Sequence, residues 1–141
     1  MVETLKQWLS EHPPPAQRFT QSLAGVALRV RAGENFFVAT RELLDEFALA
    51  PADAIRRRAI ELPPGPTGTP RYDAYLGALG EHLAVRHRLA IPPWTACADR
   101  FLDRFWFVSD VKGFRALLLT ESPAAFRRRG IFVSERSLIR V

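Results

Sequence analysis

The chain has 141 residues, of which 48% are hydrophobic and 25% charged, and this composition argues against disorder over most of its length. Its apolar runs are too short to cross a bilayer, and the N-terminal segment has no apolar stretch of signal-peptide length. A single cysteine, Cys97, cannot form an internal disulfide. We therefore expect a cytoplasmic protein that does not bind a membrane.

The formal net charge of +5 comes entirely from the C-terminal half. Residues 1–65 contain eight Lys or Arg and eight Asp or Glu, whereas residues 66–141 contain twelve basic and seven acidic residues. Such an asymmetry can steer an acidic partner, either nucleic acid or protein. However, 18 of the 20 basic residues are arginine. Codon bias in a GC-rich genome would produce the same excess, and we favour this simpler interpretation.

The N-terminal half has the apolar spacing of helices. Val2, Leu5, Trp8 and Leu9 share one helical face, and the proline run at 13–15 ends that helix. Similar stripes predict further helices over residues 19–30, 34–48 and 51–60.

Residues 62–70, LPPGPTGTP, form the one clear linker, because proline and glycine favour no regular structure there. The linker predicts either two helical subdomains, residues 1–61 and 71–141, or one domain with a surface crossing. We take two subdomains as the expected organisation.

The C-terminal half is also mainly helical by its pattern. Helices are expected over residues 71–88 and 98–106, after a cap at Ser109 or Asp110, and from Ser122-Pro123 to Gly130. Residues 131–133 are apolar and short, which is typical of a small strand or an extended packing segment. Alternating β periodicity is absent elsewhere, so the expected fold class is all-α.

Two arginine triples are candidate nucleic-acid contacts: Arg56, Arg57, Arg58 and Arg127, Arg128, Arg129. Three consecutive helical residues fan over roughly 200°, so at least one member of each triple should lie along the core edge or pair with an acid. Residues 39–60 also resemble a helix-turn-helix, with a turn at 48–51. Its second helix has no Asn or Gln to read adenine, which weakens that interpretation.

No catalytic, cofactor or metal site is expected. His82 and His87 are five residues apart, on nearly opposite faces of a helix, and cannot share a metal ion with Glu81. Asp99 and Asp103 alternate with Arg100 and Arg104 as salt-bridge partners would on a helix. Cys97 is expected to be a small buried residue. We therefore do not expect an enzyme.

Aromatic side chains are dense in residues 94–114. They are Trp94, Phe101, Phe105, Trp106, Phe107 and Phe114. Consecutive rings at 105–107 cannot all lie on one helical face. Either the helix ends there and the chain passes through the core, which we favour, or one ring stays exposed as an anchor for a partner.

Several blocks of the C-terminal half carry a family resemblance. They are RYDA at 71–74, EHLA at 81–84, PW at 93–94, RFLDRFWF at 100–107 and ESPAAFRRRGIFV at 121–133. Together they resemble small bacterial proteins, common in actinobacteria, whose genes often lie beside genes for nucleotidyltransferase-fold toxins. The resemblance covers residues 66–134 and implies an antitoxin. It transfers no catalytic residue.

The resemblance implies a non-enzymatic protein that neutralises a toxin by covering its acidic, metal-binding cleft. The expected contact residues are Arg127, Arg128, Arg129, Trp94 and Trp106, because arginine complements an acidic cleft. The alternative is a DNA-binding regulator that uses the basic C-terminal half or the 39–60 helix pair. Strong salt dependence of binding would favour the regulator.

Overall fold

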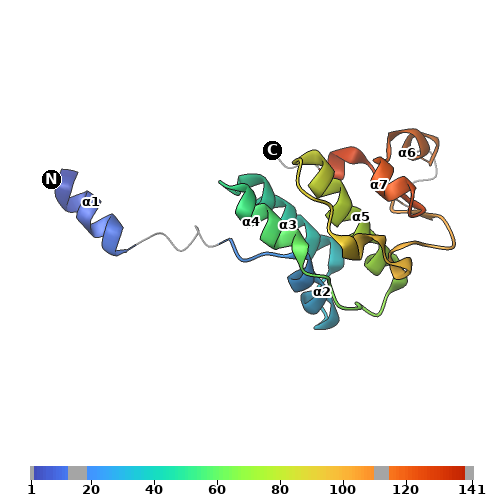
Figure 1. Ribbon diagram of the computed structural model, residues 1–141, viewed down its shortest axis with the longest axis horizontal. Coiled ribbons are helices and arrows are strands. Elements are labelled where there is room, and N and C mark those ends of the chain that lie inside the picture. The colour runs from blue at the N-terminus through green and yellow to red at the C-terminus, as the bar shows by residue number, and fades with distance from the viewer. Residues whose placement is uncertain (1, 13–18, 110–114, 139–141) are drawn as a thin grey trace.

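The computed structural model describes residues 2–12, 19–109 and 115–138, and it is predominantly helical (Figure 1). The α-helices of the described ranges are α1 (Val2–Glu11), α2 (Leu23–Arg31), α3 (Phe36–Leu49), α4 (Asp53–Glu61), α5 (Pro70–Arg86), α6 (Arg115–Glu121) and α7 (Ala124–Arg127). Single turns of 3-10 helix cover η2 (Pro93–Ala96), η3 (Ala98–Arg100) and η5 (Glu135–Leu138). One small sheet joins β1 (Trp106–Phe107) and β2 (Ile131–Phe132). The expected all-α class is confirmed.

Local capping sets the helix boundaries of the N-terminal half. The Ser22 hydroxyl accepts a hydrogen bond from Gly25 N at 2.9 Å and begins α2, and Asn35 does the same for Val38 N at 3.0 Å and begins α3. Gly33, with a φ of 104°, follows the end of α2 as expected. The helix expected from residue 19 begins later, because the amides of residues 20 and 21 bind the Glu46 carboxylate instead.

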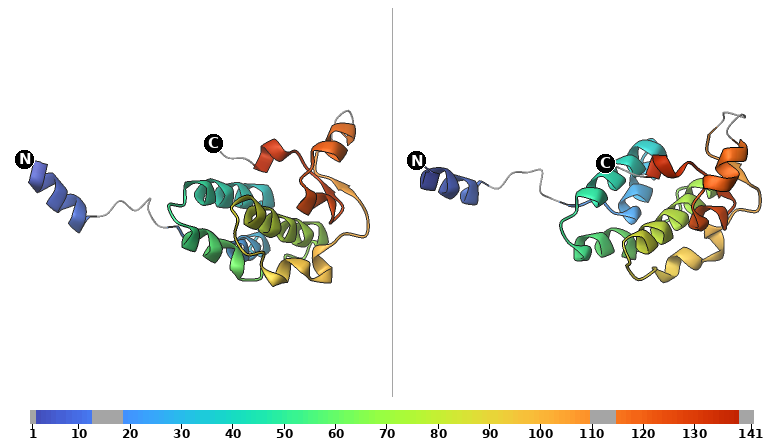
Figure 2. Two further views of the ribbon diagram at one scale, coloured as in Figure 1. Left: turned by 45° about the horizontal axis from the view of Figure 1, so that its top comes forward. Right: turned by 90° about the horizontal axis from the view of Figure 1, so that it is seen from above.

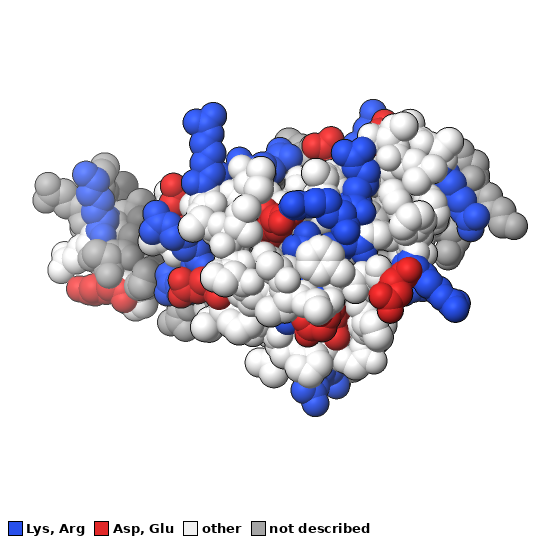
Figure 3. Space-filling view, turned by 45° about the vertical axis from the view of Figure 1, so that its right-hand side comes forward, with Lys and Arg blue, Asp and Glu red and all other residues white. Residues whose placement is uncertain are grey.

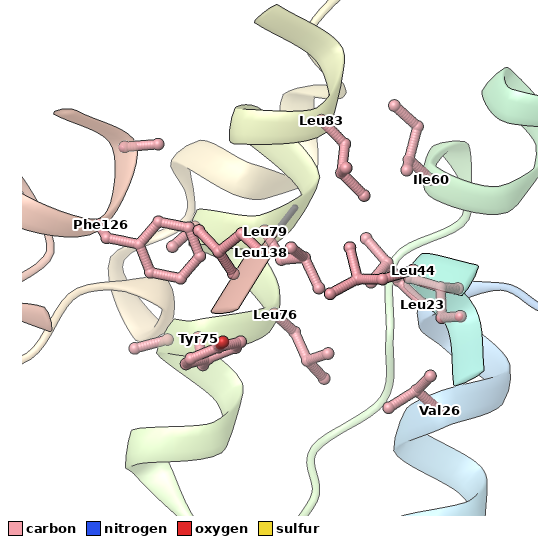
Figure 4. Close-up of a cluster of buried hydrophobic side chains, with 14 of the residues drawn as sticks. Leu23, Val26, Leu44, Ile60, Tyr75, Leu76, Leu79, Leu83, Phe126 and Leu138 are labelled. Atoms are coloured by element: carbon pink, nitrogen blue, oxygen red, sulfur yellow. The ribbon is translucent and has the colours of Figure 1, made fainter. Parts of the chain in front are cut away.

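Helix α5 is the centre of the molecule. Its residues 74–81 are all buried, so the helix is covered on nearly every side rather than on one stripe. In Figure 4, Leu76 and Leu79 of α5 point toward Leu23 and Leu44, while Phe126 packs against α5 from the opposite direction. One hydrophobic cluster thus contains residues from both sides of the linker. Helices α2–α4 and the C-terminal half share this core, and residues 62–69 cross between them.

The helix expected over residues 98–106 is wrong. The chain makes only the short turns η2 and η3 and then runs extended into β1, which pairs in parallel with β2. The amides of Leu102, Trp106 and Val108 donate to the carbonyls of Arg129, Gly130 and Phe132 at 3.0, 2.8 and 3.0 Å. These tertiary hydrogen bonds replace the helical ones. Of the two alternatives for residues 131–133, the small strand is the one that forms, as β2.

The segments around α6 and α7 differ from expectation in their caps. The cap expected at Ser109 or Asp110 bears on residues 110–114, which lie outside the described residues, and the described part of α6 is Arg115–Glu121. Ser122 does not cap α7, whose N-cap is Pro123. Instead the buried Ser122 hydroxyl donates to Leu118 O and accepts from Val133 N at 2.9 Å. Gly130, with a φ of 79°, turns the chain into β2 as expected.

Candidate functional site

Arg129 is a core residue, with only 1% of its surface exposed. Its Nη1 donates to Ala125 O at 2.8 Å and lies 3.3 Å from the Glu81 carboxylate, and its Nη2 donates to Thr95 O at 2.7 Å. Burial lowers the pKa of Arg129, and the Glu81 charge opposes that shift. Arg129 therefore joins α5, η2 and the end of α7, and it cannot reach a partner in this structure.

The other two arginines of this triple remain at the surface. Arg127 is exposed, and Arg128 is exposed but pairs with the Glu81 carboxylate. Three consecutive helical residues cannot share one face, and accordingly one arginine of this triple lies in the core and two lie at the surface. Of the expected contact arginines, Arg127 and Arg128 are available to a partner.

Both tryptophans that we expected at a contact surface are buried. Trp94 donates from Nε1 to Ile60 O at 2.9 Å, and its ring is covered by the buried Arg100 guanidinium at 5.0 Å. Trp106 packs among aromatic rings, 6.3 Å from Tyr72 and 6.1 Å from Tyr75 between centroids. Trp94 and Trp106 stabilise the fold and offer no surface to a partner, which corrects their expected role.

In this segment, two phenylalanines rather than the tryptophans are exposed to solvent. Phe105 is 71% exposed and touches the edge of Phe132, with 5.3 Å between ring centroids. Phe101 is partly exposed, and its ring covers the buried Arg129 guanidinium at 4.7 Å. The ring at position 105 faces outward because successive residues of an extended segment point to opposite sides, and Trp106 points inward.

Backbone hydrogen bonds hold the phenylalanine segment against the arginine segment. Leu102 N donates to Arg129 O at 3.0 Å, and Trp106 N donates to Gly130 O at 2.8 Å. The exposed rings therefore lie beside the chain that carries the two exposed arginines. We call this set the Phe–Arg surface; its residues are Phe101, Phe105, Arg127 and Arg128. The sequence signal for it was the run of rings at 105–107, which cannot all be buried on one side.

The first arginine triple divides in a similar way. Arg56 is half-buried, donates from Nε to Phe47 O at 3.3 Å and pairs with Asp53, whereas Arg57 and Arg58 are exposed on α4. Helices α3 and α4 do follow one another across a short turn, as the 39–60 helix pair requires. Figure 3 shows acidic side chains scattered over the face that it displays, and several basic side chains that adjoin one another near its middle.

The two histidines of α5 and its C-cap lie apart. His82 lies 5.9 Å from the Phe126 ring and His87 lies 4.9 Å from the Phe47 ring, so the two face different parts of the core. Over residues 2–12, 19–109 and 115–138, no three His, Cys, Asp or Glu side chains are placed to hold a metal ion. In the same ranges, no helix combines the length and apolar character needed to span a bilayer.

Two smaller expectations are wrong. Cys97 is exposed rather than buried, because it lies between η2 and η3 at the surface. The expected ladder of Asp99, Arg100, Asp103 and Arg104 does not form, because this segment is not an α-helix. Arg100 is buried and donates from Nη2 to Pro64 O at 2.7 Å; Asp99 lies 3.9 Å from its Nε.

Comparison of the chain with protein-family models, with curated proteins and with solved structures finds no match.

Proposed function

We propose that this chain is a non-enzymatic protein-binding module that binds an acidic partner through the Phe–Arg surface. The observation that carries the proposal is Phe105, a large aromatic ring that is 71% exposed although its neighbour Trp106 is buried. Arginine is enriched among the residues that contribute most to binding at protein interfaces, and phenylalanine is enriched in the interfaces themselves. The Phe–Arg surface combines two of each.

The buried contacts beneath the Phe–Arg surface favour binding, because they hold this surface in one conformation in the unbound protein. Arg129 is held by two backbone carbonyls and by Glu81, and Phe101 lies over its guanidinium. The strand pair β1–β2 fixes the segment of Phe105. A surface that is already ordered loses less conformational entropy on binding than a flexible one. Arg129, Trp94 and Trp106 thus support the contact residues from below.

The proposed partner is a nucleotidyltransferase-fold toxin, which the chain would neutralise as an antitoxin. The resemblance of residues 66–134 supports this identity. The chemistry agrees with it: a cleft lined by metal-binding carboxylates attracts Arg127 and Arg128, and Phe105 supplies an apolar anchor. Covering such a cleft would exclude the metal and the nucleotide from it.

The experiment that tests the proposal is affinity capture from the native host at moderate salt with nuclease present. We expect one stoichiometric protein, the nucleotidyltransferase-fold toxin, bound to the unaltered chain and lost with the Phe105→Ala variant. The matched control is Arg57→Ala with Arg58→Ala, which removes two exposed arginines from α4 and should leave capture unchanged.

Salt dependence separates this proposal from DNA binding. A protein contact centred on Phe105 should keep most of its affinity between 50 and 200 mM salt, whereas a contact made of several phosphates loses roughly 10³-fold or more. If DNA is retained without nuclease, and if the α4 control variant rather than Phe105→Ala abolishes it, the chain is a regulator and the protein-binding proposal is wrong.

A further inference from the structure

Helix α1 presents apolar side chains that nothing in the described chain covers. Leu5 is 60% exposed and Trp8 is 55% exposed, and the Trp8 ring stacks on His12 of the same segment, at 4.8 Å between centroids. Figures 1 and 2 show α1 standing apart from the remaining helices in every view. An isolated helix of ten residues is marginal in water. Its apolar face therefore needs a surface to pack against.

The body of the protein contains a groove between the C-terminal ends of α3 and α5, with a volume of about 220 Å³. We call it the α3–α5 groove; it is lined by Leu44, Phe47, Ala48, Leu83, Arg86, His87 and Leu138. All three leucines and the phenylalanine are buried and form an apolar floor, while Ala48 and Arg86 are exposed at its edge. An apolar floor with a polar edge is the kind of groove that accepts an amphipathic helix.

The groove lies within reach of α1 of the same chain. Phe19 lines a small cavity together with Phe47, which also lines the groove. The Glu46 carboxylate holds the amides of Thr20 and Gln21 at 2.6 and 2.8 Å, which fixes this part of the chain on α3. The seven Cα steps from residue 12 to residue 19 can span at most about 25 Å.

The distribution of charge favours the α3–α5 groove, rather than another groove near α4, as the binding site of α1. The charged and titratable residues of the α3–α5 groove, Arg86 and His87, carry no negative charge. The last residue of α1 is the exposed acid Glu11, whereas the exposed Lys6 lies five residues earlier in the helix. The groove lined by residues 57, 60–61 and 90–93 has both Arg57 and Glu61. We propose that α1 docks in the α3–α5 groove of its own chain through Leu5 and Trp8. This inference is independent of the proposed function.

Hydrogen–deuterium exchange of the full chain tests the docking. At a concentration where sedimentation shows a monomer, residues 2–11 should exchange at least ten-fold more slowly than they do in the Ala48→Arg variant. The exposed Ala48 tolerates a long side chain at the end of α3, and arginine keeps a high helix propensity. The matched control is Ala116→Arg, an exposed alanine on α6, and its exchange should equal that of the unaltered chain.

A second variant changes α1 rather than the groove. Trp8→Ala should increase exchange at the groove end of α5, residues 83–87, as well as in α1. Equal exchange of residues 2–11 in Ala48→Arg and Ala116→Arg would overturn the proposal. So would protection of α1 that appears only when the chain dimerises, because the occupant would then be a second copy. A change confined to residues 138–141 would assign the groove to the C-terminus and also overturn it.

Discussion

Nη1 of Arg129 lies 3.3 Å from Oε2 of Glu81, and both side chains are buried between α5 and the turn that follows α7. The pair fixes the arginine segment on the central helix. It also explains why a residue that the sequence places in a basic run is absent from the surface: its charge is balanced by Glu81 and by two carbonyl oxygens.

Replacing Glu81 should be strongly destabilising. Glu81→Gln keeps the shape of the side chain but leaves the buried Arg129 cation without its counter-charge, and we expect a loss of about 3 kcal/mol in the free energy of unfolding. Arg128→Ala is the matched control, because Arg128 is exposed and its pair with Glu81 is screened by solvent; the expected loss is below about 1 kcal/mol. Urea unfolding measures both. Equal losses would show that the Arg129 pair does not stabilise the fold.

Gly77 allows the η3 turn to approach α5. A Cβ at this position would lie 2.7 Å from the Cβ of the buried Arg100. Gly77→Ala gains about 1 kcal/mol of helix propensity but forces that contact apart, so we expect a net loss of about 1–3 kcal/mol. Gly65→Ala is the control, since no atom lies within 4 Å of a Cβ there. Thermal or urea unfolding that ranks Gly65→Ala as the less stable variant would contradict this packing.

The stability of the protein should decrease as the pH falls below about 6.5. Burial lowers the pKa of His82, and Arg86 adds to that effect while Glu135 opposes it. Burial also lowers the pKa of His87, with further lowering by Arg56 and Arg86. Because the folded state binds these protons less readily than the unfolded state, their stabilising effect is complete above the unfolded pKa of 6.5 and is lost as the pH falls through the lower, folded values.

The measurement is the free energy of unfolding from pH 7.5 to pH 5, compared with the variant His82→Asn, His87→Asn. The difference between the two proteins should be constant above pH 7 and should shift in favour of the variant toward pH 5. Both proteins have the same carboxylates, so the effect of carboxylate titration on the free energy of unfolding cancels in the difference. A difference that stays constant over this range would show that neither histidine affects stability through its charge.

Local signals were sufficient to predict most of the helices. Apolar spacing predicted α1 to α5 to within a few residues, Asn35 and Ser22 are caps of the preferred type, and Pro70 lies in the first turn of α5. The same signals failed over residues 98–109, where Leu102, Trp106 and Val108 bond to a segment more than twenty residues away. The helix propensity of a segment does not reveal hydrogen bonds to a segment that is distant in sequence.

The candidate site was predicted only in part. Arg127 and Arg128 are exposed, but Arg129, Trp94 and Trp106 are buried, because each meets a partner distant in sequence. Trp94 Nε1, for example, donates to Ile60 O across the linker at 2.9 Å. One signal was present: Gly77 and Gly80 are three residues apart on α5, and a Cβ on either would contact Arg100 or Trp94. Two glycines on one helical face indicate close packing of another segment.

The measurement that tests the central claim most directly is inhibition of the proposed partner, a purified nucleotidyltransferase-fold toxin, by the chain. The variant Phe105→Ala, Arg127→Ala, Arg128→Ala leaves the buried Arg129 in place, so it should fold normally and yet require at least a hundred-fold higher concentration to inhibit the toxin. The control variant Arg57→Ala, Arg58→Ala should inhibit as the unaltered chain does. If the triple variant neutralises the toxin as well as the control does, the Phe–Arg surface is not the binding site and the account is wrong.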